Sequence, residues 1–304
     1  MDAHHGDEAI ERAWRENRRY LLDVAYRMLG SVTDAEDVTQ EAFARLMRAD
    51  LDEIEDVRGW LVVVVGRLCI DQLRSARSRR ETYVGPWLPE PVVEPSGGVR
   101  DPAERITLDD SVRMAMLVVL ERLTPAERAA FVLHDVFQFS FEDVATIVGR
   151  SSEACRQLAS RARRRIHEET EPARFDVDPG ELSRIAERFI TASTEGDLAA
   201  LEEVLDPNVV GWTDGGGVVA APRRAVAGRD RVAARFLKFV RDFGVTLVPM
   251  PVNGEPGVVG FQDDRLIAVL AFETRDGLIS RIHSIANPAK LAYVAAMLAE
   301  RKPG

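Results

Sequence analysis

Two runs of arginine are the residues of this sequence best suited to bind phosphate. Residues 150–165 hold six arginines against the single acid Glu153: Arg150, Arg156, Arg161, Arg163, Arg164 and Arg165. Residues 67–80 hold five against Asp71 alone: Arg67, Arg74, Arg77, Arg79 and Arg80. A guanidinium group presents a planar fork of N–H donors that matches phosphate oxygens and base edges. The two runs therefore predict two separate elements that contact nucleic acid.

The run at 150–165 divides into two faces at helical spacing. If residues 151–166 are helical, an apolar set lines one face: Ala154, Cys155, Leu158, Ala162 and Ile166. The opposite face is polar and basic: Glu153, Arg156, Gln157, Ser160, Arg163 and Arg164. Together with the segment Ser140–Gly149 and a short turn, this helix has the proportions of a helix-turn-helix. A solvated amphipathic helix in an ordinary bundle is the alternative.

The run at 67–80 admits two structures. The β-branched stretch Val62–Val65 is compatible with a buried strand. A helix would place Arg67, Asp71 and Arg74 on one face, opposite Leu61, Val65, Leu68 and Cys69. The periodicity by itself leaves both possibilities open.

Further helices are predicted from their start and stop signals. Residues 34–47 carry apolar side chains at i, i+4 and i+8, with Thr33 or Asp34 available as N-cap. Thr124-Pro125-Ala126-Glu127 combines a capping box with proline at the first helical position. Ser140-Phe141-Glu142-Asp143 repeats the capping signal, and Gly149 is a C-terminal stop.

Prolines divide the chain into three segments. Residues 84–103 hold five of the fifteen prolines and predict an extended linker. A shorter joint lies at 171–180, where Pro172 and Pro179 interrupt an acidic stretch. We therefore expect domains at 1–83, 104–170 and 181–304, the first two all helical.

The third segment predicts an α+β domain. An amphipathic helix from Leu182 to Ile190 and a second helix over about 198–205 come first. Four β-rich runs follow at 245–252, 258–261, 265–274 and 278–285, with hairpin turns at Asn253-Gly254 and Asp276-Gly277. These runs predict an antiparallel sheet.

The overall charge first argues against nucleic acid. The 304 residues carry a net charge of −10, and no segment is basic: residues 1–80, 81–165 and 166–304 carry −3, −2 and −5. This average conceals the two arginine runs. The two cysteines, Cys69 and Cys155, have no metal-ligand spacing, so we expect core residues, no metal and no cofactor. No apolar run is long enough for a membrane helix, and we expect a cytoplasmic protein with no membrane partner.

Three motifs in order resemble the bacterial extracytoplasmic-function sigma factors of RNA polymerase. DAEDVTQEAF (34–43) resembles the helix of sigma region 2 that binds the β′ clamp of core polymerase. RGWLVVVVGRLCIDQLRSARSRRE (58–81) resembles the helix that binds and helps melt the −10 element, which favours helix over strand there. LTPAERAAFVLHDVFQFSFEDVATIVGRSSEACRQLASRARRRI (123–166) resembles region 4, which reads the −35 element.

The resemblance implies a promoter-specificity subunit that is not an enzyme, with core polymerase (β′ clamp and β flap) and promoter DNA as partners. The implied polymerase-binding residues are Asp34, Asp37, Gln40, Glu41 and Phe43. The implied −10 contacts are Arg58, Trp60, Arg67, Asp71, Arg74 and Arg77, with the acidic loop 50–57 capturing a base. The implied −35 contacts are Arg150, Ser151, Ser152, Arg156, Gln157, Ser160, Arg161, Arg163 and Arg164.

The remaining chain resembles a subgroup in which a SnoaL-like cone domain of the nuclear-transport-factor-two fold follows region 4. Three pieces carry this resemblance and are expected to meet in a regulatory contact: Trp87, Leu88 and Pro89 of the linker; Asp214, Gly215, Gly216 and Gly217; and Asn287, Pro288, Lys290 and Leu291. The alternative function is a small-molecule sensor or enzyme. Asp214, Trp212 and His283 would then serve a ligand pocket, which His283 could face because it shares strand parity with Ile279.

Overall fold

The computed structural model describes residues 2–80, 83–93, 106–107, 110–169 and 179–299. These residues fall into two compact units. The helical unit contains residues 1–79, 99–107 and 119–170, and the sheet unit contains residues 80–98, 108–118 and 171–304. The chain therefore passes between the two units four times from residue 79 to residue 119, a stretch that includes the proline-rich linker.

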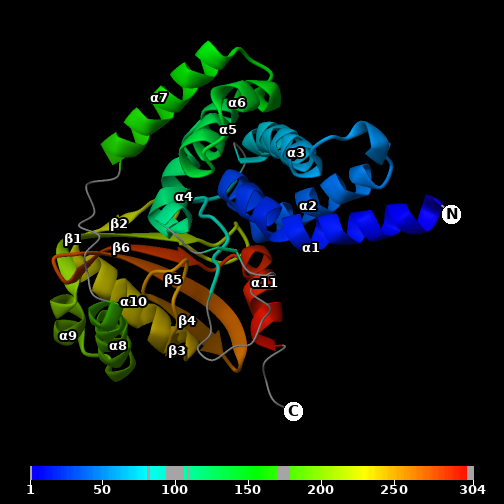
Figure 1. Cartoon of the computed structure of the whole chain (residues 1–304). Coiled ribbons are helices and arrows are strands. Elements are labelled where there is room, and N and C mark those ends of the chain that lie inside the picture. The colour runs from blue at the N-terminus through cyan, green and yellow to red at the C-terminus, as the bar shows by residue number, and fades with distance from the viewer. Residues whose placement is uncertain (1, 81–82, 94–105, 108–109, 170–178, 300–304) are drawn as a thin grey trace. The chain divides into compact units, whose positions relative to one another are not determined.

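The first part of the helical unit consists of α1 (Asp2–Leu29), α2 (Val32–Leu46), the 3-10 turn η1 (Leu51–Glu53) and α3 (Val57–Arg80) (Figure 1). The stretch Val62–Val65 lies in the middle of α3, so the helical alternative is correct there. Ser31 caps α2 by accepting a hydrogen bond from the Asp34 backbone N–H, so the expected cap at Thr33 or Asp34 is wrong. The reason is Gly30, whose φ of 67° ends α1 and leaves the extended Ser31 next in line.

The second part follows the signals in the sequence closely. It consists of α5 (Pro125–Phe131), a π-helical turn η4 (Val132–Val136), α6 (Phe141–Val148) and α7 (Ser152–Glu169). The preceding η3 (Asp110–Val112) and most of α4 (Met114–Leu120) belong to the sheet unit. The capping box of Thr124 and Glu127 is present, and Ser140 caps α6 through the Asp143 backbone N–H. Gly149 ends α6 at a φ of 72°, as predicted.

Helix α7 has the two faces that its sequence predicts. Cys155, Leu158, Ala162 and Ile166 are buried against the rest of the helical unit, where α5 and α6 pack on α7. The side chains predicted for the polar face are exposed: Glu153, Arg156, Gln157, Ser160, Arg163 and Arg164. Helix α7 is therefore packed on one face and exposes a basic surface on the other.

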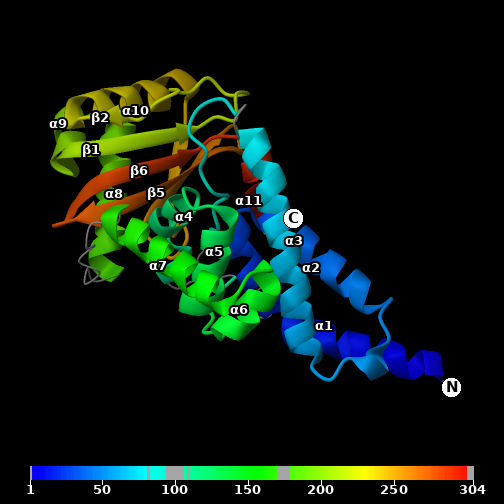
Figure 2. The same cartoon turned by 90° about the horizontal axis from the view of Figure 1, so that it is seen from above.

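The sheet unit is α+β, as predicted, but its sheet is mixed. Its helices are α8 (Pro179–Glu195), α9 (Leu198–Glu203), α10 (Arg229–Phe243) and α11 (Pro288–Ala299). The six strands are β1 (Leu205–Asp214), β2 (Val226–Ala227), β3 (Thr246–Pro249), β4 (Gly257–Gln262), β5 (Arg265–Arg275) and β6 (Leu278–Ile285), in the order β2-β1-β6-β5-β4-β3. Strand β1 pairs with β6 in parallel, and Figure 2 shows the two side by side. The four predicted strands, β3 to β6, pair antiparallel as expected, and the parallel pairing comes from β1, which was not predicted.

Left-handed turn residues set the register of the hairpins. Asn253-Gly254 and Asp276-Gly277 both adopt positive φ, as a type I′ turn requires. A further turn at Asp263 and Asp264, with φ of 47° and 64°, joins β4 to β5 and was not predicted. Aspartate tolerates this conformation better than most residues, so the signal was present but weak.

The two faces of the sheet bury different partners. Helices α8, α9 and α10 cover one face, with Phe189, Leu201, Val232, Phe272 and Ile282 in that core. The other face packs against α11 and the linker, through residues such as Leu88, Val93, Met114, Ile285 and Leu291. Linker residues are thus part of the hydrophobic core of the sheet unit. None of the helices within the described residues is long and apolar enough to cross a membrane.

Candidate functional site

The arginines of α7 differ in what they contact. Arg161 and Arg165 both reach the buried carboxylate of Glu127 on α5, at 3.2 and 3.5 Å. Arg163 pairs with Asp135 at 3.2 Å. Arg156 lies 3.4 Å from Glu142 and 3.6 Å from Glu153, where all three side chains are largely exposed. Arg161 and Arg165 therefore fasten α7 to α5, whereas the exposed arginines at its start remain accessible.

The carboxylate of Glu127 is the shared partner of Arg161 and Arg165. Burial alone would raise the pKa of its carboxyl group, but hydrogen bonds from the Thr124 backbone N–H and hydroxyl oppose that effect. The charge of Arg165 and the hydrogen bond from Arg161 act in the same direction, and the pKa is held below its ordinary value. The carboxylate is thus ionised at neutral pH and binds two arginines of the neighbouring helix.

On α3, the predicted basic face is exposed along Arg67, Asp71 and Arg74. Arg74 lies 3.4 Å from Asp71, and Arg67 donates a hydrogen bond to the backbone oxygen of Thr146 at 3.0 Å. Arg58 stacks its guanidinium 4.1 Å from the ring centre of Tyr20, and Trp60 is half-buried. The side chain of Arg77 lies outside the described residues.

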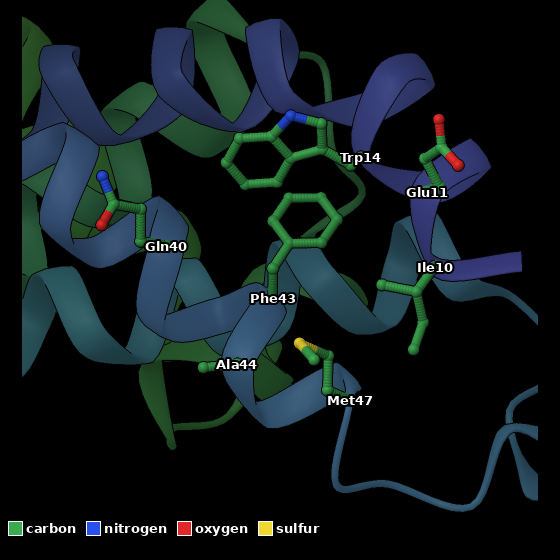
Figure 3. A pocket seen from close by; sticks show the side chains of 7 residues that line it. All are labelled: Ile10, Glu11, Trp14, Gln40, Phe43, Ala44 and Met47. Carbon is green, nitrogen blue, oxygen red and sulfur yellow. The ribbon is translucent and has the colours of Figure 1, made fainter. Parts of the chain in front are cut away.

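The exposed face of α2 borders an apolar cleft. Asp37, Gln40 and Glu41 are exposed, and Phe43 is buried edge-on against Trp14 with ring centres 4.7 Å apart. The cleft has a volume of about 430 Å³, and Figure 3 shows the side chains of α1 and α2 around it. Its lining consists of Ile10, Glu11, Trp14, Gln40, Phe43, Ala44 and Met47. Met47 is 65% exposed at the rim.

Sequence reasoning missed Ile10, Trp14 and Met47. Their spacing was readable, because Ile10 and Trp14 are four residues apart and Met47 follows Phe43 at the same interval. What the sequence did not show is that the two helices present these pairs to each other.

In the sheet unit, the side chain of Asp214 collects four hydrogen bonds while fully buried. The Leu88 backbone N–H and the Lys290 ammonium donate to Oδ2 at 2.9 and 2.7 Å, and the Gly216 N–H donates to Oδ1 at 3.0 Å. The Tyr83 hydroxyl also donates to Oδ1. The three sequence pieces around Trp87, Asp214 and Asn287 thus come together around one carboxylate, which we call the Asp214 cluster.

Lys290 and Asn287 complete the Asp214 cluster from the start of α11. Lys290 is 4% exposed; it donates to the Leu88 carbonyl oxygen, and its ammonium lies 3.3 Å from the ring centre of Trp87. The Asn287 side chain donates to the Tyr83 hydroxyl at 3.0 Å. A Cβ on Gly216, whose φ is 65°, would lie only 2.5 Å from the Asn287 amide, so glycine is required there.

The remaining members of the three pieces take packing positions in the same place. Pro89 and Leu291 are buried, and Pro288 opens α11 at its first position. A side chain on Gly215 would meet the Val219 carbonyl at 2.4 Å, and Gly217 has a φ of 74°.

Two residues outside those pieces hold the linker as well. The first is Tyr83: burial raises the pKa of its hydroxyl, and the hydrogen bond to Asp214 raises it further. Asn253, in the turn after β3, accepts from the Val92 N–H at 3.1 Å and donates to the Val112 carbonyl at 2.9 Å. One asparagine therefore holds both Val92 of the linker and Val112, which lies beyond the linker and just before region 4. The turn signal at Asn253-Gly254 was recognised, but this second role was not.

His283 does not face the helix-covered side of the sheet. It stacks on Trp212, with ring centres 5.2 Å apart, and Trp212 packs with the linker-side core. A register irregularity between Glu273 and Thr274 breaks the parity with Ile279, which points to the helix-covered core. The expected strand parity between His283 and Ile279 is therefore wrong. On the helix-covered side, the ring of Phe189 contacts those of Phe236 and Phe272.

His283 instead belongs to a buried polar pair. Its Nε2 lies 2.6 Å from Glu273, which also pairs with Arg281 at 3.1 Å. Burial would raise the pKa of Glu273, but the hydrogen bond and charge of His283 and the charge of Arg281 hold it below its ordinary value. Among the described residues, no group of three or more His, Cys, Asp or Glu side chains is arranged to hold a metal ion.

Comparison with known proteins identifies two regions of the chain. Residues 13–79 match the model of Sigma-70 region 2, and residues 113–166 match that of Sigma-70 region 4. The probable ECF RNA polymerase sigma factor SigI of Mycobacterium tuberculosis is 43% identical over 96% of this chain and 98% of its own length. The ECF RNA polymerase sigma factor SigJ of the same species is 41% identical over 94% of this chain and 93% of its own.

The solved structures agree too. The crystal structure of the Mycobacterium tuberculosis extracytoplasmic function sigma factor SigJ matches with a TM-score of 0.72 and 38% identity, over 92% of this chain and 97% of that one. The chain belongs to the extracytoplasmic-function sigma factors of RNA polymerase, and in it two helical sigma regions precede an α+β domain. Sigma factors are not enzymes: they bind core RNA polymerase and promoter DNA and direct transcription initiation.

Proposed function

We propose that α2 and the cleft beside it form the surface that binds the β′ clamp of core polymerase. The face of α2 offers exposed acidic and amide groups at Asp37, Gln40 and Glu41. The cleft beside them offers Trp14, Phe43 and Met47 as an apolar seat. An apolar centre with a polar rim is the usual construction of a stable protein interface.

We further propose that the exposed faces of α3 and α7 read the two promoter elements. Arg67 and Arg74 on α3 serve the −10 element. On α7 the bases and phosphates of the −35 duplex are contacted by Arg150, Ser151, Ser152, Arg156, Gln157, Ser160, Arg163 and Arg164. Arg161 is better assigned to holding α7 in place, because its partner Glu127 is buried. Region 4 contacts the β flap of polymerase when this helix is in the groove.

The C-terminal domain, in this proposal, regulates the distance between regions 2 and 4. The observation that carries this is the Asp214 cluster, which fixes linker residues 83–88 to the sheet unit. Asn253 fixes the linker again at Val92 and Val112, immediately before region 4. Residues 80–118, if released and fully extended, would span about 130 Å. While the attachments hold, most of that length is unavailable for separating the two DNA-binding regions.

Run-off transcription tests this role of the Asp214 cluster. Wild type, Lys290→Met and Asp214→Asn would be compared with saturating core polymerase on one promoter, with polymerase occupancy measured in parallel. We expect transcript yield to change by at least threefold when the cluster is broken, because the linker then sets a different spacing. The exposed-pair variant Lys238→Met is the matched control. Equal yields for all variants at equal occupancy would rule out a regulatory role for the cluster.

A further inference from the structure

A third basic stretch of the chain lies in the sheet unit, around β2 and α10. Residues 223–243 hold seven basic residues against two acids, Asp230 and Asp242. The contrast with the surrounding domain is strong, because residues 166–304 as a whole carry a net charge of −5. Neither the promoter contacts proposed for α3 and α7 nor the Asp214 cluster involves this stretch. It is therefore a concentrated positive charge for which no role has been given.

Helix α10 exposes its charged residues because its apolar residues pack on the sheet. Val232, Ala233 and Val240 are buried in the core of the helix-covered face, where α8 and α9 also lie (Figure 1). Arg231 and Arg235 are exposed and stand one helical turn apart on the side away from that core. The linker packs on the other face of the sheet, so the exposed side of α10 stays accessible while the Asp214 cluster is intact.

The cations of this stretch differ in whether an acid neutralises them. Lys238 lies 2.6 Å from the carboxylate of Asp242, and Arg241 lies 3.2 Å from the same group. Among the described residues, no carboxylate forms an ion pair with the other exposed arginines of the stretch: Arg223, Arg224, Arg231 and Arg235. Four guanidinium groups are therefore available to a negatively charged partner.

The exposed side of α10 suits a phosphate backbone better than a protein surface. A stable protein interface usually has an apolar centre that is poor in charge, but Ala234 and the last residue, Phe243, are the only apolar residues among the exposed ones of α10. Arg231 and Arg235 lie about 6 Å apart along the helix axis, and phosphates recur about every 3.4 Å along one strand of duplex DNA. Each guanidinium can therefore meet its own phosphate, which it matches as a planar fork of donors.

We propose that α10, together with Arg223 and Arg224 before β2, forms a third DNA-binding surface, which contacts the phosphate backbone of the promoter duplex without reading its bases. The surface belongs to the C-terminal domain and adds to the contacts of α3 and α7. This domain is joined covalently to the promoter-bound regions, so it meets the duplex at high effective concentration and needs few contacts. The proposal requires promoter binding by the holoenzyme, but it does not require the regulatory role of the Asp214 cluster.

The dependence of DNA affinity on salt tests these phosphate contacts. Holoenzyme containing the full chain would be titrated onto one promoter fragment between about 50 and 200 mM salt, where each contact contributes about 0.9 to the slope of log affinity against log salt concentration. The α10 double variant, Arg231→Gln/Arg235→Gln, should make that slope shallower by about 1.8 and weaken binding severalfold at the lowest salt. Arg231→Lys/Arg235→Lys keeps both charges and should retain most of the slope.

The matched control removes the same two charges from exposed positions elsewhere in the domain, as Arg188→Gln/Arg265→Gln. Arg188 pairs with Glu203 at 3.9 Å, and Arg265 directly follows two aspartates in the chain, so both lie in negative surroundings. We expect the control to keep the slope of the wild type. A wild-type slope in the α10 double variant, or an equal decrease in the control, would overturn the proposal.

Crosslinking from α10 distinguishes DNA from an acidic surface of the polymerase. Ala234 is exposed next to Arg235, and the natural Cys69 and Cys155 are both buried. Ala234→Cys in the full chain would be labelled with a photoreactive maleimide and irradiated in the complex of holoenzyme and promoter. We expect crosslinks to the DNA. Crosslinks to a polymerase subunit alone, or to neither partner, would overturn the proposal.

Discussion

At the residue scale, the arginines of this protein do two kinds of work, and type alone does not distinguish them. Arg128, Arg161 and Arg165 use their donors on carbonyls and carboxylates inside the protein. Arg156 and Arg164 project from the exposed face of α7. A run of arginine in the sequence therefore overestimates the number of phosphate contacts, and the correction comes from the buried acid Glu127.

The Lys290–Asp214 pair gives a prediction about stability. Both side chains are almost completely buried, at 4% and 0% exposure. Lys290→Met would leave a buried carboxylate without its cation, and we expect the free energy of unfolding to fall by about 3 kcal/mol or more. The control is Lys238→Met, which breaks a solvent-exposed ion pair with Asp242 and should lower the free energy of unfolding far less. Similar losses of unfolding free energy in Lys290→Met and Lys238→Met, measured by urea unfolding, would contradict this prediction.

The carboxyl groups of Glu127 and Glu273 predict how stability depends on pH. Each has its pKa lowered in the folded state from the ordinary 4.5. A lowered folded pKa adds stability above the unfolded pKa, and that stability is lost as the pH falls through the folded value. Urea unfolding between pH 6 and 3 should therefore show a decline beginning near pH 4.5. Glu127→Gln and Glu273→Gln should each flatten it, and an unchanged slope in both would refute the assignment.

At the element scale, α7 separates DNA reading from packing within one helix. Gln157→Ala alters the exposed face, so we expect discrimination at the −35 element to fall by about 1–3 kcal/mol with unchanged thermal stability. Arg161→Ala should do the reverse: lose about 1 kcal/mol of stability while keeping the base preference. Binding to −35 variants by the holoenzyme, together with thermal melts, distinguishes the two. Loss of base preference in Arg161→Ala alone would reverse our assignment.

The surface formed by α1 and α2 gives a prediction about polymerase binding. Met47→Glu places a charge at the rim of the apolar cleft and should weaken core binding at least tenfold, since a charge there would have to be desolvated. Met47 is exposed in the free chain, so the melting temperature should not change. Leu198→Glu, an exposed leucine of the C-terminal domain, is the matched control. Undiminished core affinity of Met47→Glu would place the polymerase surface elsewhere.

The elements that sequence reasoning recovered are those with local signals. The capping box at Thr124 and the glycine stop at Gly149 act within one helical turn, and both are found in the structure. Strand β1 (Leu205–Asp214) was missed because its residues include proline, asparagine and glycine without clear alternation, and part of it was assigned to the preceding helix. Its parallel partner β6 is more than 60 residues away, so no local pattern indicates the pairing.

The residues of the candidate site, too, were predicted only in part from the sequence. The pieces around Trp87, Asp214 and Asn287 were singled out by resemblance, and the hydrogen bonds show what joins them. Tyr83 and Asn253 complete the arrangement, but their roles depend on contacts across more than 100 residues of sequence. The contact between Ile147 and Gly66 is of the same kind, because a glycine within a helix shows in the sequence only that another group approaches closely.

At the scale of the whole molecule, the net charge of −10 and the two arginine faces belong together. A chain with this acidic average attracts free duplex DNA weakly, since non-specific binding depends on phosphate neutralisation. The linker adds a second restraint, because two of its stretches are built into the sheet unit. We therefore expect promoter binding to depend on core polymerase.

The most direct test of the central assignment is run-off transcription on fragmented genomic DNA, with core polymerase in the presence and absence of the full chain. We expect a set of transcription start sites that require the chain and share a two-part promoter motif. Gln157→Ala should relax only the −35 half, and Arg74→Ala should weaken use of the −10 half. Starts that are identical with and without the chain would contradict the account.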